Sequence, residues 1–208
     1  MVLCAYGLTV EGRRELIDFL VVSAEGEDTW KSFLLDLYRR GLKGTHLELI
    51  TTDGQKGAIK ALHYVWPRVA HQRCWVHKLR NLENRLKASQ RACLDEAKEI
   101  YQQEHRRGAL GCFGAWKRRW WRAAPGAVRC VEEDLEELLA FYDVPTAHWK
   151  RVRSTNVIER LFVEVRRRIR TMCAFTTRGS CERILYSVFA RMNNHWDSHP
   201  LNAFTHNS

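Results

Sequence analysis

The chain has 208 residues, of which 45% are hydrophobic, so it is long enough to fold around a substantial core. No segment approaches the roughly 20 apolar residues that span a bilayer, and the first residues lack the pattern of a signal peptide. We therefore expect a cytoplasmic protein without membrane contact. Seven cysteines at scattered positions favour free thiols in a reducing compartment over a disulfide framework.

The first 77 residues follow a β-β-α-β-α-β pattern, which is typical of an α/β protein. Apolar and β-branched runs predict the strands, helical spacing of apolar residues predicts the helices, and Gly and Pro mark their ends. In chain order we predict a strand at 2–10, a turn at Gly12, a strand at 15–23, a helix from 28–29 to Gly41, a strand at 47–52, a helix that Pro67 ends and a strand at 69–76.

The strand pattern stops after residue 77. Beyond it the sequence predicts helices, which glycines at 108–114 interrupt. Two final helices carry apolar stripes that face a core, from Ile158 to Met172 and from Cys181 to Trp196. We predict three consecutive parts: 1–77 as the first part of an α/β core, 78–150 as a helical insertion, and 151–208 as the closing helices.

The net charge of +10 is concentrated in two parts of the chain. Residues 1–77 carry +1 and residues 123–147 carry −5, whereas 78–122 and 148–208 each carry +7. A single basic cluster is equally well explained as a solvated helix face. Two clusters that flank an acidic site favour binding to nucleic acid, because phosphates attract Lys and Arg.

Asp53 follows the predicted strand at 47–52 and precedes Gly54 and a helix. Ligands and reacting groups gather at the carboxyl ends of strands in α/β folds. A short carboxylate there is a suitable ligand for Mg²⁺ or Mn²⁺. The alternative is structural, because Asp-Gly is a common turn and Asp53 could cap the following helix. Taken alone, Asp53 favours the structural alternative.

Glu159 lies in the first turn of the helix that starts at Asn156. Asn156 and Glu159 have the spacing of a capping box, which is again a structural alternative. The apolar stripe flanks Glu159, so its side chain can border the core while it faces a cleft. Taken alone, Glu159 also favours the structural role.

Cys74 and His77 form a Cys-x-x-His pair at the end of a predicted strand. A structural zinc site usually needs four ligands, and no second pair has a matching spacing. His71, Cys93 and His105 are the remaining loose candidates. We therefore expect no zinc and predict a hydrogen-bonding role for Cys74 and His77 beside the acidic site.

Two groups of basic residues could bind DNA phosphates through forked guanidinium groups and ammonium groups. One follows Glu159 on the helix face opposite the apolar stripe. The other surrounds Trp120 and Trp121, which could stack on unpaired bases, although core packing is the alternative for both. The candidate DNA-binding residues are Arg153, Arg166, Arg167, Arg168, Arg170, Lys117, Arg118, Arg119 and Arg122.

Four motifs occur in order along the chain: TTDGQKG, RCWVHKLRN, RSTNVIERLFVEVRRR and a terminal helix ending in NNHW. Together they resemble the Mutator-type transposases, a group of DDE transposases, over nearly the whole chain. The resemblance implies a ribonuclease-H-like α/β core with an all-helical insertion before the last catalytic helix. It makes Asp53 the second catalytic aspartate and Glu159 the catalytic glutamate, while Cys74 and His77 match the family signature and Asn156 lies beside the glutamate.

The resemblance implies metal-assisted phosphoryl transfer, with two Mg²⁺ or Mn²⁺ ions about 4 Å apart at the carboxylates. Water would nick the end of the element, and the freed 3′-hydroxyl would attack target DNA. The implied partners are transposon ends, target DNA, and further copies of the chain or full-length transposase, with the protein at the nucleoid when it is bound to DNA. The family's first catalytic aspartate lies upstream of the segment matching residues 2–10, so we expect a truncated C-terminal catalytic part that is inactive alone.

Three alternatives stay open. A non-catalytic DNA-binding remnant of a transposase would explain the two +7 segments. A ribonuclease-H-like nuclease for other substrates would use the same carboxylates but leaves the Cys-x-x-His and Ser-Thr-Asn motifs unexplained. A structural helical protein would keep Asp53 and Glu159 far apart.

Overall fold

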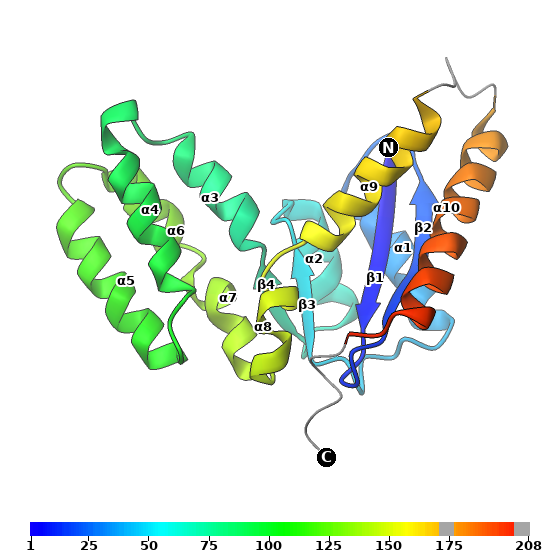
Figure 1. Cartoon of the computed structure of the whole chain (residues 1–208), viewed down its shortest axis with the longest axis horizontal. Coiled ribbons are helices and arrows are strands. Elements are labelled where there is room, and N and C mark those ends of the chain that lie inside the picture. Colours follow the sequence, from blue (N-terminus) through cyan, green and yellow to red (C-terminus); the bar gives the residue numbers. More distant parts are fainter. Residues whose placement is uncertain (171–176, 202–208) are drawn as a thin grey trace. The chain divides into compact units, whose positions relative to one another are not determined.

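The computed structural model describes residues 1–170 and 177–201 and shows a mixed α/β chain (Figure 1). The predicted β-β-α-β-α-β order of the first part is confirmed. Its elements are β1 (Val2–Leu8), β2 (Arg14–Val21), α1 (Glu27–Arg39), β3 (Leu49–Thr52), α2 (Lys56–Val65) and β4 (Ala70–Arg73).

Helices account for the regular structure after β4. They are α3 (Trp75–Glu83), η1 (Ala88–Gln90), α4 (Arg91–Ile100), α5 (Arg106–Trp120), α6 (Pro125–Glu132), α7 (Leu135–Leu139), η2 (Ala140–Asp143), α8 (Thr146–Val152), α9 (Asn156–Ile169) and α10 (Arg178–Ser198). Residues 78–150 are all described and contain no strand, as predicted. Within the described residues, no helix combines the length and the apolar character needed to cross a membrane.

The fourth strand is shorter than predicted. The sequence predicts a strand at 69–76, but β4 ends at Arg73 and α3 begins at Trp75. Cys74 lies between them in an extended conformation, directly before the first helical residue. The prediction of a strand at 74–76 is wrong because the apolar side chain of Trp75 is buried at the start of a helix.

The predicted interruption by glycines is also wrong. Gly108 and Gly111 lie inside α5, which continues without a break past Gly114. A glycine costs a helix roughly 1 kcal/mol relative to alanine. Burial of Phe113 and Trp116 on one face of α5 outweighs that cost.

Contacts divide the chain into two compact units that are not consecutive segments. The hairpin unit contains Met1–Lys43, Lys56–Val65 and the residues from Asn156 onward. The parallel-strand unit contains Gly44–Gln55 and Trp66–Thr155. The described strands form one two-stranded sheet in each unit. The three consecutive parts and the ribonuclease-H-like core stay predictions.

In the hairpin unit, β1 and β2 are antiparallel and meet at a turn. Gly12 in that turn has a φ of +82°, a left-handed conformation that glycine adopts without strain. The predicted core-facing stripes of α9 and α10 pack against the hairpin. The buried residues of this cluster are Leu16, Leu161, Val165, Leu185, Val188, Phe189 and Trp196.

The NNHW motif fastens α10 to the hairpin. The Asn193 side chain accepts a hydrogen bond from the Leu16 backbone N at 2.9 Å and donates one to the Leu16 O at 3.1 Å. The Trp196 ring packs edge-on against Tyr6, with 5.5 Å between the ring centroids. The motif therefore has a structural role in the hairpin unit.

Some sequence-based predictions fall on residues that the structure does not describe. Met172 at the end of the first apolar stripe and Cys173 lie outside the described residues, as does the side chain of Ile169. The other six cysteines are free thiols, as predicted.

In the parallel-strand unit, β3 and β4 are parallel, in the register Leu49↔Ala70 to Thr52↔Arg73. Two strands alone make a marginal sheet, so the helices supply the core. Figure 1 shows α3, α4, α5 and α6 side by side in this unit. The largest buried side chains of its core cluster are Trp75, Leu82, Leu94, Ile100, Phe113, Trp116, Leu138, Leu139 and Phe141.

Buried polar side chains tie these helices to β4 and α3. Gln72 is 0% exposed, and its side chain accepts a hydrogen bond from Phe141 N at 2.7 Å and donates one to Leu138 O at 3.0 Å. The Lys78 side chain is also buried and pairs with Asp134. These polar contacts fix which helix surface meets the strands.

Candidate functional site

Asp53 lies where the sequence predicts, directly after the last residue of β3. Its Oδ1 accepts a hydrogen bond from Gln55 N at 3.0 Å, and Gly54 has a φ of +97°. The turn expected from the structural alternative is therefore present. The carboxylate is nevertheless exposed at the carboxyl edge of the β3–β4 pair, where α/β folds place ligands.

Cys74, His77 and Thr155 form a cluster at the same edge. Cys74 follows β4, and its backbone N donates to Thr52 O at 2.8 Å. Its buried Sγ accepts hydrogen bonds from the Thr155 N and Oγ1, each at 3.3 Å. The Thr155 Oγ1 also lies 3.4 Å from the His77 Nδ1. The Cys-x-x-His motif therefore contacts the Ser-Thr-Asn motif directly.

The chain just before the Ser-Thr-Asn motif is fastened to the same elements. The Val152 O accepts a hydrogen bond from the Thr51 side chain, and the Arg153 O accepts one from Trp75 N at 3.0 Å. The Arg153 guanidinium donates to Tyr101 O at 2.9 Å and lies 4.8 Å from the centroid of its ring. Arg153, which is predicted to bind DNA, therefore makes intramolecular contacts.

Hydrogen bonding sets Cys74 apart from other cysteines in the core. Burial raises the pKa of its thiol, whereas hydrogen bonds with His77 and Thr155 lower it, so the pKa lies below the usual value of 9.0. Burial raises the pKa of Cys93 to about 11 and that of Cys4 to about 12. The Cys74 sulfur is thus suited to accept hydrogen bonds.

The other candidate zinc ligands make separate contacts. His71 Nε2 lies 2.8 Å from the Thr52 Oγ1, and Cys93 is fully buried inside α4. His105 precedes α5, and its Nδ1 accepts a hydrogen bond from Gly108 N at 2.8 Å. The absence of zinc stays a prediction.

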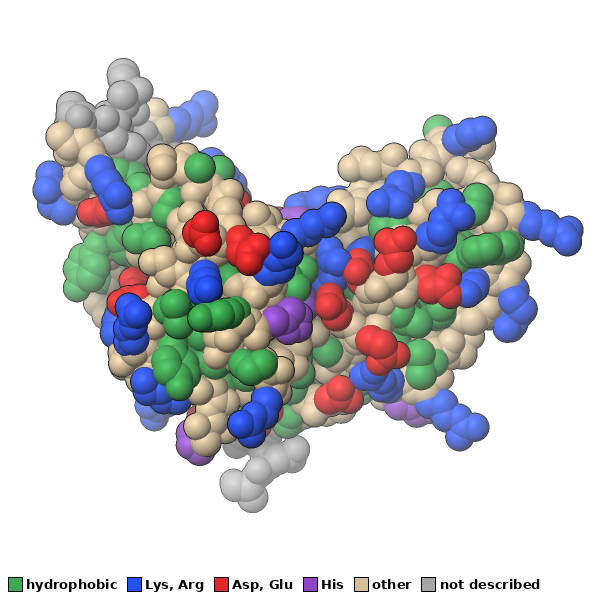
Figure 2. Space-filling view, turned by 180° about the vertical axis from the view of Figure 1, so that it is seen from behind, with side chains coloured by type: hydrophobic (Ala, Val, Ile, Leu, Met, Phe, Trp, Pro, Cys, Tyr) green, Lys and Arg blue, Asp and Glu red, His purple; other side chains and the backbone are tan. Residues whose placement is uncertain are grey.

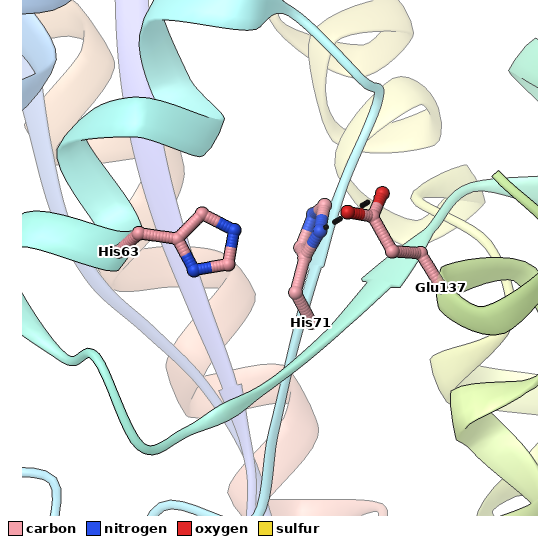
Figure 3. Close-up of side chains that lie close together, drawn as sticks. All are labelled: His63, His71 and Glu137. Atoms are coloured by element: carbon pink, nitrogen blue, oxygen red, sulfur yellow. Dashed lines mark ion pairs between the residues drawn. The ribbon is translucent and has the colours of Figure 1, made fainter. Parts of the chain in front are cut away.

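An ionic network joins α7 to β4 and to the Asp53 turn. The His71 Nδ1 lies 3.3 Å from the Glu137 Oε2 (Figure 3). This contact lowers the pKa of Glu137, and Arg73 lowers it further. Arg73 pairs with Asp134 at 2.6 Å and donates to the backbone of the Asp53 turn at 3.1 Å. A side chain at Gly54 would collide with the Arg73 guanidinium.

Glu159 is half-buried in the first turn of α9. The helix begins at Asn156, whereas a capping box needs Asn156 as the residue before the helix. Glu159 belongs to the hairpin unit and Asp53 to the parallel-strand unit. Their proximity, their metal binding and their catalytic roles stay predictions.

Several of the candidate DNA-binding residues pair with nearby carboxylates. Arg167 and Arg168 both contact Glu164 at 2.9 Å, and Lys117 pairs with Glu132. The exposed candidates without an ion pair to any described residue are Arg118, Arg122, Arg166 and Arg170. Figure 2 shows basic and acidic side chains interspersed on the face in view, so the net charge alone does not locate a DNA-binding surface.

Trp120 and Trp121 have different environments. Trp120 packs against the core cluster, and its Nε1 donates to Glu96 at 2.8 Å; Arg119 pairs with the same carboxylate at 3.1 Å. Trp121 is 43% exposed, and the Lys117 Nζ lies 5.5 Å from its ring centroid. Core packing therefore describes Trp120, while Trp121 is accessible at the surface.

Thr155, Arg73, Asp134 and Glu137 take part in these contacts but are not predicted from the sequence. Thr155 and Arg73 lie inside motifs that the sequence presents, RSTN and RCWVH, so their positions were a usable signal. Asp134 and Glu137 lie in the acidic run EEDLEEL, where no pattern distinguishes them from solvated helix residues.

Comparison with known proteins gives a consistent group of matches. The family model described as "Transposase, Mutator family" matches residues 1–199. The chain is 35% identical over 196 residues to the transposase for insertion sequence element ISRM5 of Rhizobium meliloti (strain 1021), which covers 94% of this chain and 49% of that protein.

Two further relatives show similar coverage. The chain is 35% identical over 191 residues to the transposase for insertion sequence element IST2 of Acidithiobacillus ferrooxidans, with 91% of this chain and 64% of that protein covered. It is 31% identical over 195 residues to the transposase for IS256 in transposon Tn4001 of Staphylococcus aureus, with 92% and 49% covered. The chain thus spans between 49% and 64% of the length of these three relatives.

Proposed function

The chain belongs to the Mutator family of transposases, and from this premise we propose that it is a catalytic-domain part of a DDE-type DNA transposase. Its proposed reaction is metal-dependent cleavage of DNA followed by strand transfer during transposition. The proposed substrates are transposon ends and target DNA. Asp53 and Glu159 are the proposed metal ligands, and Mg²⁺ or Mn²⁺ is the proposed ion.

One observation carries this proposal beyond family membership. Asp53 follows β3, and Thr155 is bound through Cys74 at the end of β4, which is the same edge of the parallel pair. The helix with Glu159 starts at the residue after Thr155. A helix rises about 1.5 Å per residue, so the anchored residue and the glutamate are separated by roughly one turn. This chain path supports a shared role for the two carboxylates.

The residues present fit hard divalent cations. Carboxylate oxygens bind such ions and leave positions open for phosphate oxygens. When bound, the ions would stabilise the attacking and leaving oxygens of an in-line displacement. The turn at Asp53, with its hydrogen bond to Gln55 N, holds one carboxylate at the strand edge. Family resemblance implies three carboxylates, and Asp53 and Glu159 are the two proposed here.

Calorimetric titration of the purified chain with MnCl₂ tests the assignment. We expect Asp53→Asn and Glu159→Gln each to weaken Mn²⁺ binding by more than about tenfold. Substitution of a residue that only hydrogen-bonds to a metal ligand typically lowers metal affinity by at least about tenfold, and loss of a ligand should have a larger effect. The controls are Asp95→Asn and Glu182→Gln, which change exposed carboxylates paired with Lys98 and Arg178. Binding that survives both site substitutions would overturn the proposed ligands.

A non-catalytic DNA-binding role is the second candidate. It is favoured by exposed Arg118 and Arg122, which have no ion pair to a described residue and lie close in sequence to the exposed Trp121. It predicts salt-sensitive DNA binding without any Mn²⁺ requirement. Fluorescence anisotropy with labelled DNA, at several salt concentrations and with or without Mn²⁺, separates it from the catalytic proposal.

A further inference from the structure

The Cys-x-x-His motif has a defined place in the parallel-strand unit but no chemical role in the proposed reaction. The Cys74 side chain is 1% exposed, so it is not available to attack a substrate. Its sulfur is instead the acceptor for two hydrogen bonds from one residue, Thr155. The motif therefore acts on the chain at Thr155.

The hydroxyl of Thr155 can satisfy both neighbours at once. A hydroxyl donates one hydrogen bond and can accept others, while a neutral imidazole has one donor nitrogen and one acceptor nitrogen. With His77 donating from Nδ1, the path His77 Nδ1–H to Thr155 Oγ1–H to Cys74 Sγ satisfies the hydroxyl as both acceptor and donor. All three groups are held within the parallel-strand unit.

Thr155 is the last in a series of anchors along this stretch. Val152 and Arg153 are bound through their carbonyl oxygens to Thr51 and Trp75, and Thr155 is bound through its amide and hydroxyl. The next residue begins α9. The contacts at Thr155 are thus the final restraint on the chain before the helix that carries the glutamate.

We propose that Cys74, His77 and Thr155 form a clamp that fixes the start of α9, and that these three are positioning residues for Glu159. The clamp is an intramolecular arrangement that stands on its own contacts, while its value for metal binding rests on the proposed function. Its hydrogen bonds hold Thr155 at the edge that also carries Asp53, and Thr155 is the residue directly before the helix.

Hydrogen exchange measured by mass spectrometry tests the clamp. Thr155→Val keeps the shape of the side chain but removes the hydroxyl. We expect the backbone amides of residues 159–163, which the first helical turn protects, to exchange about tenfold faster, since one lost hydrogen bond is worth about that factor. Thr155→Ser retains the hydroxyl and is expected to restore slow exchange. Cys74→Ala removes the acceptor and should reproduce the local effect of Thr155→Val.

Cys93→Ser is the matched control, because Cys93 is equally buried but lies inside α4. It is expected to lower global stability without a selective effect on residues 159–163. Exchange that rises by the same factor throughout the chain in Thr155→Val and Cys74→Ala would mean general destabilisation and would overturn the clamp. Unchanged exchange at 159–163 in both variants would also overturn it.

The MnCl₂ titration, applied to the same variants, separates the clamp from the proposed function. Faster local exchange with Mn²⁺ binding weakened about tenfold or more supports the clamp as a positioning device. If the variants show faster local exchange but the unaltered chain binds no Mn²⁺, the result supports the clamp and counts against the proposed metal site. Weakened Mn²⁺ binding without a local change in exchange counts against the clamp.

Discussion

The two units differ in the kinds of contact that stabilise each of them internally. The hairpin unit packs two helices against a two-stranded hairpin through apolar side chains, and its ion pairs, such as Lys60 with Glu27, lie at the surface. The parallel-strand unit also has an apolar core, but it contains buried polar and charged side chains as well. The buried polar or charged residues among those described are His71, Gln72, Lys78 and His148, all in the parallel-strand unit.

This difference bears on the candidate site. Apolar packing is non-directional and tolerates small shifts, whereas a buried hydrogen bond requires one arrangement of its partners. The Asp53 turn is bonded to Arg73, which pairs with Asp134, which in turn pairs with Lys78. The carboxylate at the strand edge is therefore connected to a directional network, while Glu159 lies on a helix held mainly by apolar contacts.

The largest loss of stability is expected from substitution of Lys78, which pairs with Asp134 in that network. Lys78→Met leaves Asp134 with one partner fewer in a largely buried place. Breaking a buried ion pair typically costs 3–5 kcal/mol, and we expect about 3 kcal/mol because Arg73 remains paired with Asp134. Urea unfolding measures the loss. The control Lys60→Met removes an exposed pair in the hairpin unit and should cost less than about 1 kcal/mol. Equal losses would remove the contrast between the units.

A smaller loss is expected at the buried amide. Gln72→Leu leaves the Phe141 N–H without its acceptor, whereas Leu138 O keeps the hydrogen bond from the indole of Trp75 at 2.7 Å. One buried unsatisfied donor costs roughly 1–3 kcal/mol, so we expect a loss of about 2 kcal/mol. Asn193→Leu, the nearest counterpart in the hairpin unit, is only partly buried and should cost about 1 kcal/mol. Urea unfolding of both variants tests this order, and the reverse order would contradict it.

Much of the fold follows from local sequence patterns. The order of the first six elements, the helical part after residue 77 and the apolar stripes of α9 and α10 all depend on periodicity over short windows. The ends of elements are less predictable. An aromatic residue such as Trp75 favours a strand in the sequence, but in the structure it is buried and starts a helix. The helix through Gly108 and Gly111 shows the same override of local preference by packing.

The site was predictable only in part. Asp53 at a strand end is a local pattern, and the structure places it there. The partnership of Cys74 with Thr155 joins positions 81 residues apart, and Gln72 with Phe141 joins positions 69 apart. No local spacing encodes such contacts, and the side chains concerned resemble ordinary polar residues in sequence. The pairing of Asp53 with Glu159 remains a prediction for the same reason.

A weaker and pH-dependent effect is expected at Glu137. Contact with His71 lowers the pKa of this carboxyl in the folded chain below its usual value of 4.5, although burial opposes the shift. The stabilisation is therefore present above pH 4.5 and is lost as the pH falls through the lowered folded pKa. Urea unfolding between pH 6 and pH 3 should show a shallower acid-side loss in Glu137→Gln. Glu136→Gln, at a 79% exposed neighbouring carboxylate, should keep the slope of the unaltered chain.

The smallest effect on stability is expected at the surface of the parallel-strand unit. Arg118→Ala and Arg122→Ala remove exposed guanidinium groups without an ion pair to a described residue, so each should change the free energy of unfolding by less than about 0.5 kcal/mol. If they contact DNA, each loss should lower the slope of log affinity against log salt by about 0.9. Arg178→Ala, which removes a partner of Glu182 in the hairpin unit, serves as control. Anisotropy titrations at several salt concentrations measure these slopes. A lower slope in Arg118→Ala and Arg122→Ala, with an unchanged slope in Arg178→Ala, would place the DNA contact on the parallel-strand unit. Equal slopes in all three variants would count against a DNA contact there.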